Sequence, residues 1–146
     1  PVRGQVSFAP PGRKLEVPVT GDGFVAPTPD GCAFGATFQI DDFEREPRAS
    51  DHAANLARAE SLLPGFTAGL DPARLAGRVA FRATTPDRLP IYGELASGLH
   101  AALGLGARGL LWAPLGAELI ASRMEGEPWP VEREIVEAVG SGRFRA

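Results

Sequence analysis

The sequence of 146 residues predicts an α+β fold, with an antiparallel or mixed sheet first and a buried helix near the C-terminus. Three observations predict this fold. Short apolar runs separated by Gly, Pro and Asp fill the first part of the chain, as in a sheet with tight turns. A charged stretch and an approximate helical pattern follow them. A later run of small and apolar residues, LLWAPLGAELIASRM, is typical of a helix that is buried on most sides.

The composition is that of an ordinary water-soluble domain, with 44% hydrophobic and 23% charged residues. A net charge of −3 gives no overall positive field toward nucleic acid, although local Arg clusters could still contact phosphate. The single cysteine excludes an internal disulfide, and Cys32 is predicted as a buried strand residue. No signal peptide or apolar stretch of membrane-spanning length is visible, so we expect a cytoplasmic protein without a membrane partner.

Four short strands are expected in the first part, over GQVSFAP, KLEVPVT, GFVAPT and GCAFGATFQI. The segments PPG, TGDG and PDG between them have turn chemistry, because glycine adopts positive φ without a steric penalty. We expect an antiparallel meander whose last two strands form a hairpin through Pro29–Gly31.

A helix is expected over DHAANLARAESLLPG, after the charged and Pro-broken stretch IDDFEREPRA. Ser50 or Asp51 is the predicted N-cap, and Pro64–Gly65 ends the helix. His52 is expected on its exposed side. An approximate apolar face is formed by Ala54, Leu56, Ala59, Leu62 and Leu63.

Strand structure is expected again in GRVAFRATTPDRLPIYGEL and in SGLHAALGLG, which contains His100. The buried helix then ends at GEPWP, and VEREIVEAVG forms a short amphipathic helix. Trp112 and Trp129 are expected to pack in the core and between helices. The charged segments DDFERE and VEREIVE are expected to be solvated, and neither histidine has partners at the spacing of a metal site.

Gly104, Gly106 and Gly109 have the G-x-G-x-x-G spacing of a dinucleotide-binding fingerprint. That fingerprint requires a regular helix followed by a parallel strand, whereas Pro114 interrupts this segment and two further prolines and a helix follow. We therefore interpret the match as a glycine-rich loop of another kind. It could bind an anion at a helix N-terminus or only allow close packing, and the spacing does not decide between the two.

Arg82 lies at the end of an apolar strand, where its burial is costly without a carboxylate or phosphate partner. A salt bridge to a neighbouring acidic residue would be the simple explanation. The polar segment TTPDRLP follows it and is expected near the glycine loop, so the two could form one cleft. Tyr92 either lines that cleft or packs within a strand.

Taken in order, RGQVSF, FRATTPDRLPIYG and GLGARGLLWAPLGAELIASRMEGEPWPVER resemble the C-terminal half of the FAD-dependent D-amino-acid-oxidase-like family. Within this family the last segment, together with the closing GRF, is most similar to the oxidoreductase part of bacterial bifunctional enzymes that make 5-methylaminomethyl-2-thiouridine in tRNA. The N-terminal FAD fingerprint of the family is absent, so we expect a fragment without the Rossmann part. The stretch between Gly93 and Leu99 is shorter than expected for the family.

The resemblance divides the chain into residues 1–98, a substrate-side sheet and helix, and residues 99–146, which would complete the FAD domain. It implies FAD as the cofactor and Arg82 as the residue that holds the substrate carboxylate. It gives Arg3 and Gln5 only a structural role. The residues that it places against the isoalloxazine ring are Gly104, Gly106, Ala107, Arg108, Gly109 and Leu110. The N-terminus of the following helix would stabilise negative charge at the pyrimidine end of the flavin.

The implied substrate is the carboxymethylaminomethyl-uridine at the tRNA wobble position, which loses its carboxymethyl group as glyoxylate. A methyltransferase part, absent from this chain, would then methylate the product amine. Two alternatives remain open at this point. One is a small-molecule oxidase of the same fold that acts on glycine, sarcosine or a D-amino acid, and the other is a freestanding binding or assembly module without redox activity.

Overall fold

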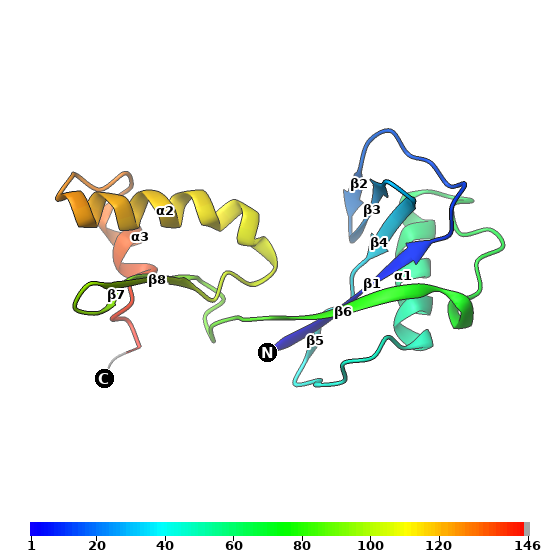
Figure 1. The fold of residues 1–146 in the computed structure, drawn as a ribbon, viewed down its shortest axis with the longest axis horizontal. Helices are drawn as coiled ribbons and strands as arrows, with labels where there is room; N and C mark the ends of the chain where they lie inside the picture. The colour runs from blue at the N-terminus through cyan, green and yellow to red at the C-terminus, as the bar shows by residue number, and fades with distance from the viewer. Residues whose placement is uncertain (145–146) are drawn as a thin grey trace. The chain divides into compact units, whose positions relative to one another are not determined.

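The computed structural model describes residues 1–144 (Figure 1). Along the chain these residues divide into two compact units between Phe81 and Arg82. Strands and helices occur in both units, so the predicted α+β class is confirmed. The predicted division of function at residue 98 stays a prediction. In chain order the elements are β1 (Val2–Ala9), β2 (Val19–Gly21), β3 (Gly23–Thr28), β4 (Gly31–Gly35), β5 (Gln39–Ile40), α1 (Ala49–Leu62), η1 (Pro72–Arg74), β6 (Ala76–Arg82), β7 (Ile91–Ala96), β8 (Leu99–Leu103), η2 (Gly106–Arg108), α2 (Gly109–Glu125) and α3 (Arg133–Ala138).

The sheet of the first unit has the order β2-β3-β4-β1-β5, and β6 also pairs with β1. The hairpin of β3 and β4 turns at Pro29 and Asp30, as predicted, with Thr28 opposite Gly31. The predicted meander is wrong, because β1 pairs with β4 and not with β2. Most of the KLEVPVT segment is not a strand, which leaves a long connection after β1 instead of a tight turn. Prolines in and beside this connection lack the N–H that a central strand must donate.

Helix α1 packs against β1, β3 and β4 and buries the apolar core of the first unit (Figure 1). Cys32 lies in this core on β4, as predicted. The helix begins at Ala49 with Arg48 as N-cap, and no side chain caps it, so the predicted cap at Ser50 or Asp51 is wrong. The buried apolar residues of this cluster are Ala9, Val25, Cys32, Phe34, Leu56 and Ala59.

The face of α1 toward β1 is polar, and this feature overturns the prediction for His52. His52 is buried, and its Nδ1 lies 2.7 Å from the Ser7 Oγ atom on β1. Asn55 donates hydrogen bonds from the same helix to the Ser7 Oγ atom and to the Gln5 carbonyl oxygen. Hydropathy places such residues on the solvent side, whereas here the strand supplies polar partners for them.

Arg3 is the most deeply buried charge of this interface, with an exposed fraction of 0%. Its Nη1 atom donates to the Asp51 carboxylate at 2.5 Å and to the Gln39 side chain at 2.8 Å. Its other nitrogens donate to the carbonyl oxygens of Glu44 and Glu46. Arg3 therefore ties α1 and the loop before it to β1, which agrees with the structural role expected of it.

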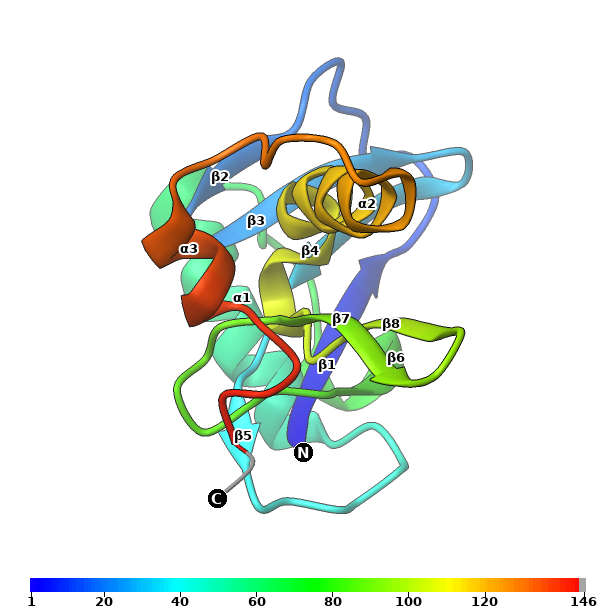
Figure 2. The same cartoon turned by 90° about the vertical axis from the view of Figure 1, so that its left-hand side faces the viewer.

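The second unit consists of the antiparallel β7–β8 hairpin, α2 and α3 (Figure 2). Tyr92, Leu119 and Val139 form its buried centre, and Trp112 packs against them as predicted. The Tyr92 hydroxyl donates to the Trp112 carbonyl oxygen at 2.7 Å. Gly116 makes this arrangement possible, since a Cβ atom there would lie 2.3 Å from the Tyr92 ring.

Helix α2 has the predicted position, but the prediction that it is buried on most sides is wrong. Only Gly116, Leu119 and Ser122 are buried, whereas Leu110 is 97% and Leu111 71% exposed. The hairpin and the C-terminal segment cover one side of the helix, and the described residues of the second unit supply no second layer for its other apolar side chains. No helix within residues 1–144 is both long enough and apolar enough to cross a membrane.

Candidate functional site

Arg82 is the last residue of β6 and the first residue of the second unit. Its side chain is half-buried, and this burial lowers the pKa of its guanidinium group from the usual value. An arginine remains protonated near neutral pH even so. Arg82 therefore presents a fixed positive charge at the start of the segment that leads toward the glycine loop.

Residues 83–85 lie against the glycine loop, as expected from the sequence. The Gly106 N–H donates to the Ala83 carbonyl oxygen at 3.0 Å, and Thr84 forms an antiparallel bridge with Leu105. The two segments are therefore held by backbone contacts directly after Arg82.

Two glycines allow this close approach. Gly104 has φ +66° and Gly106 has φ +58°, a region that favours glycine. A Cβ atom on Gly104 would lie 2.9 Å from the Thr85 methyl group, and one on Gly106 would lie 3.3 Å from the Thr84 methyl group. Conformation favours glycine at both positions, and the Thr85 methyl group also leaves no room for a side chain at Gly104.

Gly109 differs from these two glycines in its backbone conformation. It has φ −55° and is the first residue of α2. A Cβ atom on Gly109 would meet nothing closer than 3.6 Å, the distance to the Leu105 Cβ atom. Neither the backbone nor the packing of the described residues demands glycine at this position.

The N-terminus of α2 fits a flat, partly polar aromatic ligand such as the flavin ring. Arg108 is its N-cap residue but makes no side-chain capping bond, so no capping side chain occupies the first N–H groups. These groups and the positive helix end suit a carbonyl-bearing ring edge. Leu110 and Leu111 present exposed apolar surface beside them, which suits a ring face. Ala107 and Arg108 are exposed in the preceding turn.

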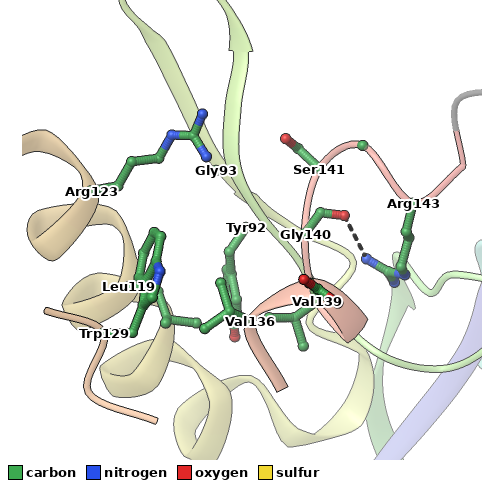
Figure 3. Close-up of a pocket in the computed structure, with 12 residues that line it drawn as sticks. Tyr92, Gly93, Leu119, Arg123, Trp129, Val136, Val139, Gly140, Ser141 and Arg143 are labelled. Carbon is green, nitrogen blue, oxygen red and sulfur yellow. Dashed lines mark hydrogen bonds between the residues drawn. The ribbon is translucent and has the colours of Figure 1, made fainter. Parts of the chain in front are cut away.

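A pocket of about 320 Å³ lies elsewhere in the second unit, among β7, α2, α3 and residues 139–143 (Figure 3). Tyr92 packs in the core, which confirms that role, and it also lines this different pocket, whereas its role in a cleft beside Arg82 stays a prediction. Neither Arg82 nor the glycine loop takes part in it. No sequence motif predicted this pocket, because backbone pairing of Tyr92 with Val139 and Ser141 creates it. Its lining is Tyr92, Gly93, Leu119, Arg123, Trp129, Val136, Glu137, Val139, Gly140, Ser141, Gly142 and Arg143.

The β7–β8 hairpin is short in the stretch between Gly93 and Leu99, which the sequence predicted to be shortened. The strands end at Ala96 and begin again at Leu99, so Ser97 and Gly98 alone connect them. Gly98 has φ +74°, as a tight turn requires.

Comparison with protein families finds that a model described as "FAD dependent oxidoreductase" matches residues 1–123. The chain is 48% identical to the "tRNA 5-methylaminomethyl-2-thiouridine biosynthesis bifunctional protein MnmC" of Burkholderia cenocepacia (strain HI2424). That alignment covers 99% of this chain and 27% of the relative. The protein of the same name from Burkholderia mallei (strain SAVP1) is 46% identical over 98% of this chain and 26% of its own length.

The chain therefore spans about a quarter of the length of these relatives. The first alignment extends over 171 residues, more than the 146 of this chain, so the relative carries additional residues within the aligned region. The expected shortening between Gly93 and Leu99 stays a prediction, because the difference in total length does not give its position in the chain.

Solved structures share the fold. Glycine oxidase from Geobacillus kaustophilus matches with a TM-score of 0.74 and 24% identity, over 100% of this chain and 40% of that chain. Iminodiacetate oxidase from Chelativorans sp. BNC1 matches with a TM-score of 0.69 and 24% identity, over 96% of this chain and 39% of that chain.

Proposed function

Because this chain belongs to the family of FAD-dependent oxidoreductases, we propose that it forms the part of an amine-oxidising enzyme that holds the substrate carboxylate and the flavin ring. The observation that carries this proposal is the backbone bond from Gly106 to Ala83, which joins the glycine loop to the segment after Arg82. Bound FAD would accept a hydride from the carbon beside the substrate amine. The residues of this chain would orient the substrate and the ring for that step.

In this proposal Arg82 holds the substrate carboxylate through the two-nitrogen fork of its guanidinium group. Its position at the end of β6, with its charge retained, supports that role. The glycine loop holds the ring through backbone and small side chains, and the exposed Leu110 covers apolar ring surface. The proposed ring-contacting residues are Gly104, Gly106, Ala107, Arg108, Gly109 and Leu110.

We further propose that the substrate is the carboxymethylaminomethyl-uridine at the wobble position of tRNA, in the bacterial cytoplasm. The 48% identity to proteins named for 5-methylaminomethyl-2-thiouridine synthesis supports this choice. The chain covers 27% of the first relative, so the FAD-nucleotide and methyltransferase parts would belong to a longer polypeptide. Within that polypeptide this chain contributes to removal of the carboxymethyl group.

A small amino acid is the second candidate substrate, because the structural neighbours include a glycine oxidase and an iminodiacetate oxidase. Their identity of 24% supports a shared fold and not a shared substrate. Glyoxylate release by the full-length protein can be compared among carboxymethylaminomethyl-tRNA, glycine and sarcosine. We expect release from the tRNA at a far higher kcat/KM, and preferred turnover of free glycine or sarcosine would reverse the assignment.

This chain by itself is expected not to retain FAD. The proposed contacts reach only the ring, whereas tight dinucleotide binding in such folds also uses a glycine-rich turn at the pyrophosphate. The chain would be mixed with excess FAD and desalted, and its visible spectrum would be recorded beside that of the full-length protein. A stoichiometric yellow complex of this chain would contradict the prediction.

Replacing Gly109 by valine in the full-length protein is expected to lower flavin binding without lowering the stability of the flavin-free form. A Cβ atom there would make only an ordinary contact with Leu105, at 3.6 Å, and valine has a higher helix propensity than glycine. A side chain there would instead project where we place the ring. Bound FAD per protein and the melting temperature without FAD are the two measurements.

Gly116→Val is the matched control within the same helix. Its Cβ atom would lie 2.3 Å from the Tyr92 ring, so the flavin-free form should lose stability through overpacking, typically by about 1–3 kcal/mol. If Gly109→Val also destabilised the flavin-free form and its folded fraction bound FAD normally, Gly109 would have only a packing role.

A further inference from the structure

A bidentate ion pair joins the C-terminal segment to the loop that follows Arg82. Arg143 donates from Nε to one Asp87 carboxylate oxygen at 2.8 Å and from Nη2 to the other at 3.1 Å. Nη2 also donates to the Leu89 carbonyl oxygen at 2.7 Å. The Arg143 side chain is only 12% exposed, and its guanidinium group lies 4.4 Å from the centre of the Phe144 ring. The guanidinium fork is thus held on several sides, in a geometry that lysine cannot reproduce.

Two acceptors of Arg143, Asp87 and Leu89, are also the points at which the loop closes on itself. Asp87 accepts a hydrogen bond from the Leu89 N–H at 3.0 Å. The Thr85 hydroxyl donates to the Leu89 carbonyl oxygen at 2.5 Å, and the Arg88 N–H donates to the Thr85 carbonyl oxygen. The hydrogen bond from Arg143 holds the pKa of Asp87 well below its usual range, so this carboxylate stays charged at neutral pH. Arg143 therefore holds the turn through both the Asp87 carboxylate and the Leu89 carbonyl oxygen.

The same loop sets the position of the glycine loop. The methyl group of the buried Thr85 lies 2.9 Å from the position of a Cβ atom on Gly104, and the Ala83 carbonyl oxygen accepts the Gly106 N–H. A continuous set of contacts thus leads from Arg143 through Asp87 and Leu89 to Thr85 and the glycine loop.

We propose that Arg143 is a positioning residue for the flavin-ring site, which acts by holding residues 83–90 against the glycine loop. The proposal rests on the function proposed above. Arg143 touches neither substrate nor ring in this account. Its effect is on the geometry of residues that do.

The test compares Arg143→Gln with the unchanged full-length protein carrying FAD. Amide hydrogen exchange should rise about tenfold in segments 83–90 and 104–109, because a loop loses its charged anchor. The visible absorption bands of the bound flavin should shift, and kcat/KM should fall about tenfold at full flavin occupancy. Asp87→Asn should produce the same changes, and the double variant should add little to either.

Arg133→Gln is the matched control, since Arg133 makes a similar 2.8 Å bond to Glu137 on the exposed side of α3. Amide hydrogen exchange, the flavin absorption bands and kcat/KM should all stay unchanged in Arg133→Gln. If Arg143→Gln does not fold, Arg143→Lys replaces it and should give the same exchange pattern with smaller changes. A lower melting temperature with unchanged exchange in both segments and an unchanged flavin spectrum would overturn the proposal. The exchange result needs no substrate, so it stands apart from a failure of the proposed reaction.

Discussion

Replacing Arg82 by lysine in the full-length protein is expected to lower kcat/KM by about ten- to a hundredfold and to leave the flavin content unchanged. Lysine keeps the positive charge but cannot form the two parallel bonds of a guanidinium group with a carboxylate. A lost hydrogen bond to a charged group costs about 1.5–3 kcal/mol, and each 1.36 kcal/mol corresponds to about tenfold in rate. Steady-state kinetics on carboxymethylaminomethyl-tRNA, with bound FAD measured by absorbance, test this expectation.

Arg78→Lys is the control for this substitution, because Arg78 lies on the same strand but is exposed. It should have the kinetics of the unchanged protein. Unchanged kinetics of Arg82→Lys as well would remove Arg82 from the site, and a loss of flavin in that variant would assign it a different role.

Replacing Asp51 by alanine is expected to lower the free energy of unfolding of this chain by about 3–5 kcal/mol, because it leaves a buried charge without its partner. That charge is Arg3, whose exposed fraction is 0% and whose Nη1 atom lies 2.5 Å from the Asp51 carboxylate. Urea unfolding followed by circular dichroism measures the effect. Asp22→Ala is the control, since the fully exposed Asp22 lies 4.0 Å from Arg58 and should contribute little.

The Asp51–Arg3 pair also makes the free energy of unfolding depend on pH. Burial is the largest single influence and would raise the pKa of Asp51, but the hydrogen bonds from Arg3, Gln39 and Arg48 and the charge of Arg48 together outweigh it, so the pKa lies below its usual value. The carboxylate therefore binds fewer protons in the folded state than in the unfolded state. Its contribution is complete above the unfolded pKa of about 4 and is lost as the pH falls through the folded value. Asp51→Ala should show a weaker loss of stability on acidification, and an unchanged slope would contradict this account.

Local signals in the sequence predicted those parts of the fold that depend on neighbouring residues. The Pro-Asp-Gly turn identified the β3–β4 hairpin, and the small and apolar run identified α2. The pairing of β1 with β4 could not be predicted in this way, because it depends on the path of the connection between them. The burial of His52 also escaped prediction, since its partner Ser7 lies 45 residues away in the chain.

In the candidate site, too, local features could be predicted from the sequence and long-range contacts could not. The sequence placed the segment after Arg82 near the glycine loop, because a strand end and a strand-to-helix turn meet there. Positive φ occurs at Gly104 and Gly106 but not at Gly109, a distinction that the G-x-G-x-x-G spacing does not make. The bond between Asp87 and Arg143 spans 56 residues and has no local signal. Only the folded chain brings these two side chains together.

The contact between Gly116 and Tyr92 has a consequence for the evolutionary history of this family. Because the aromatic ring occupies the space of a Cβ atom at position 116, the two positions cannot drift independently. A lineage that gained alanine at 116 would first need a smaller side chain at 92, and it would then lose the hydroxyl that binds the Trp112 carbonyl oxygen. We therefore expect the two positions to covary among homologues, with glycine retained wherever an aromatic residue occupies the other position.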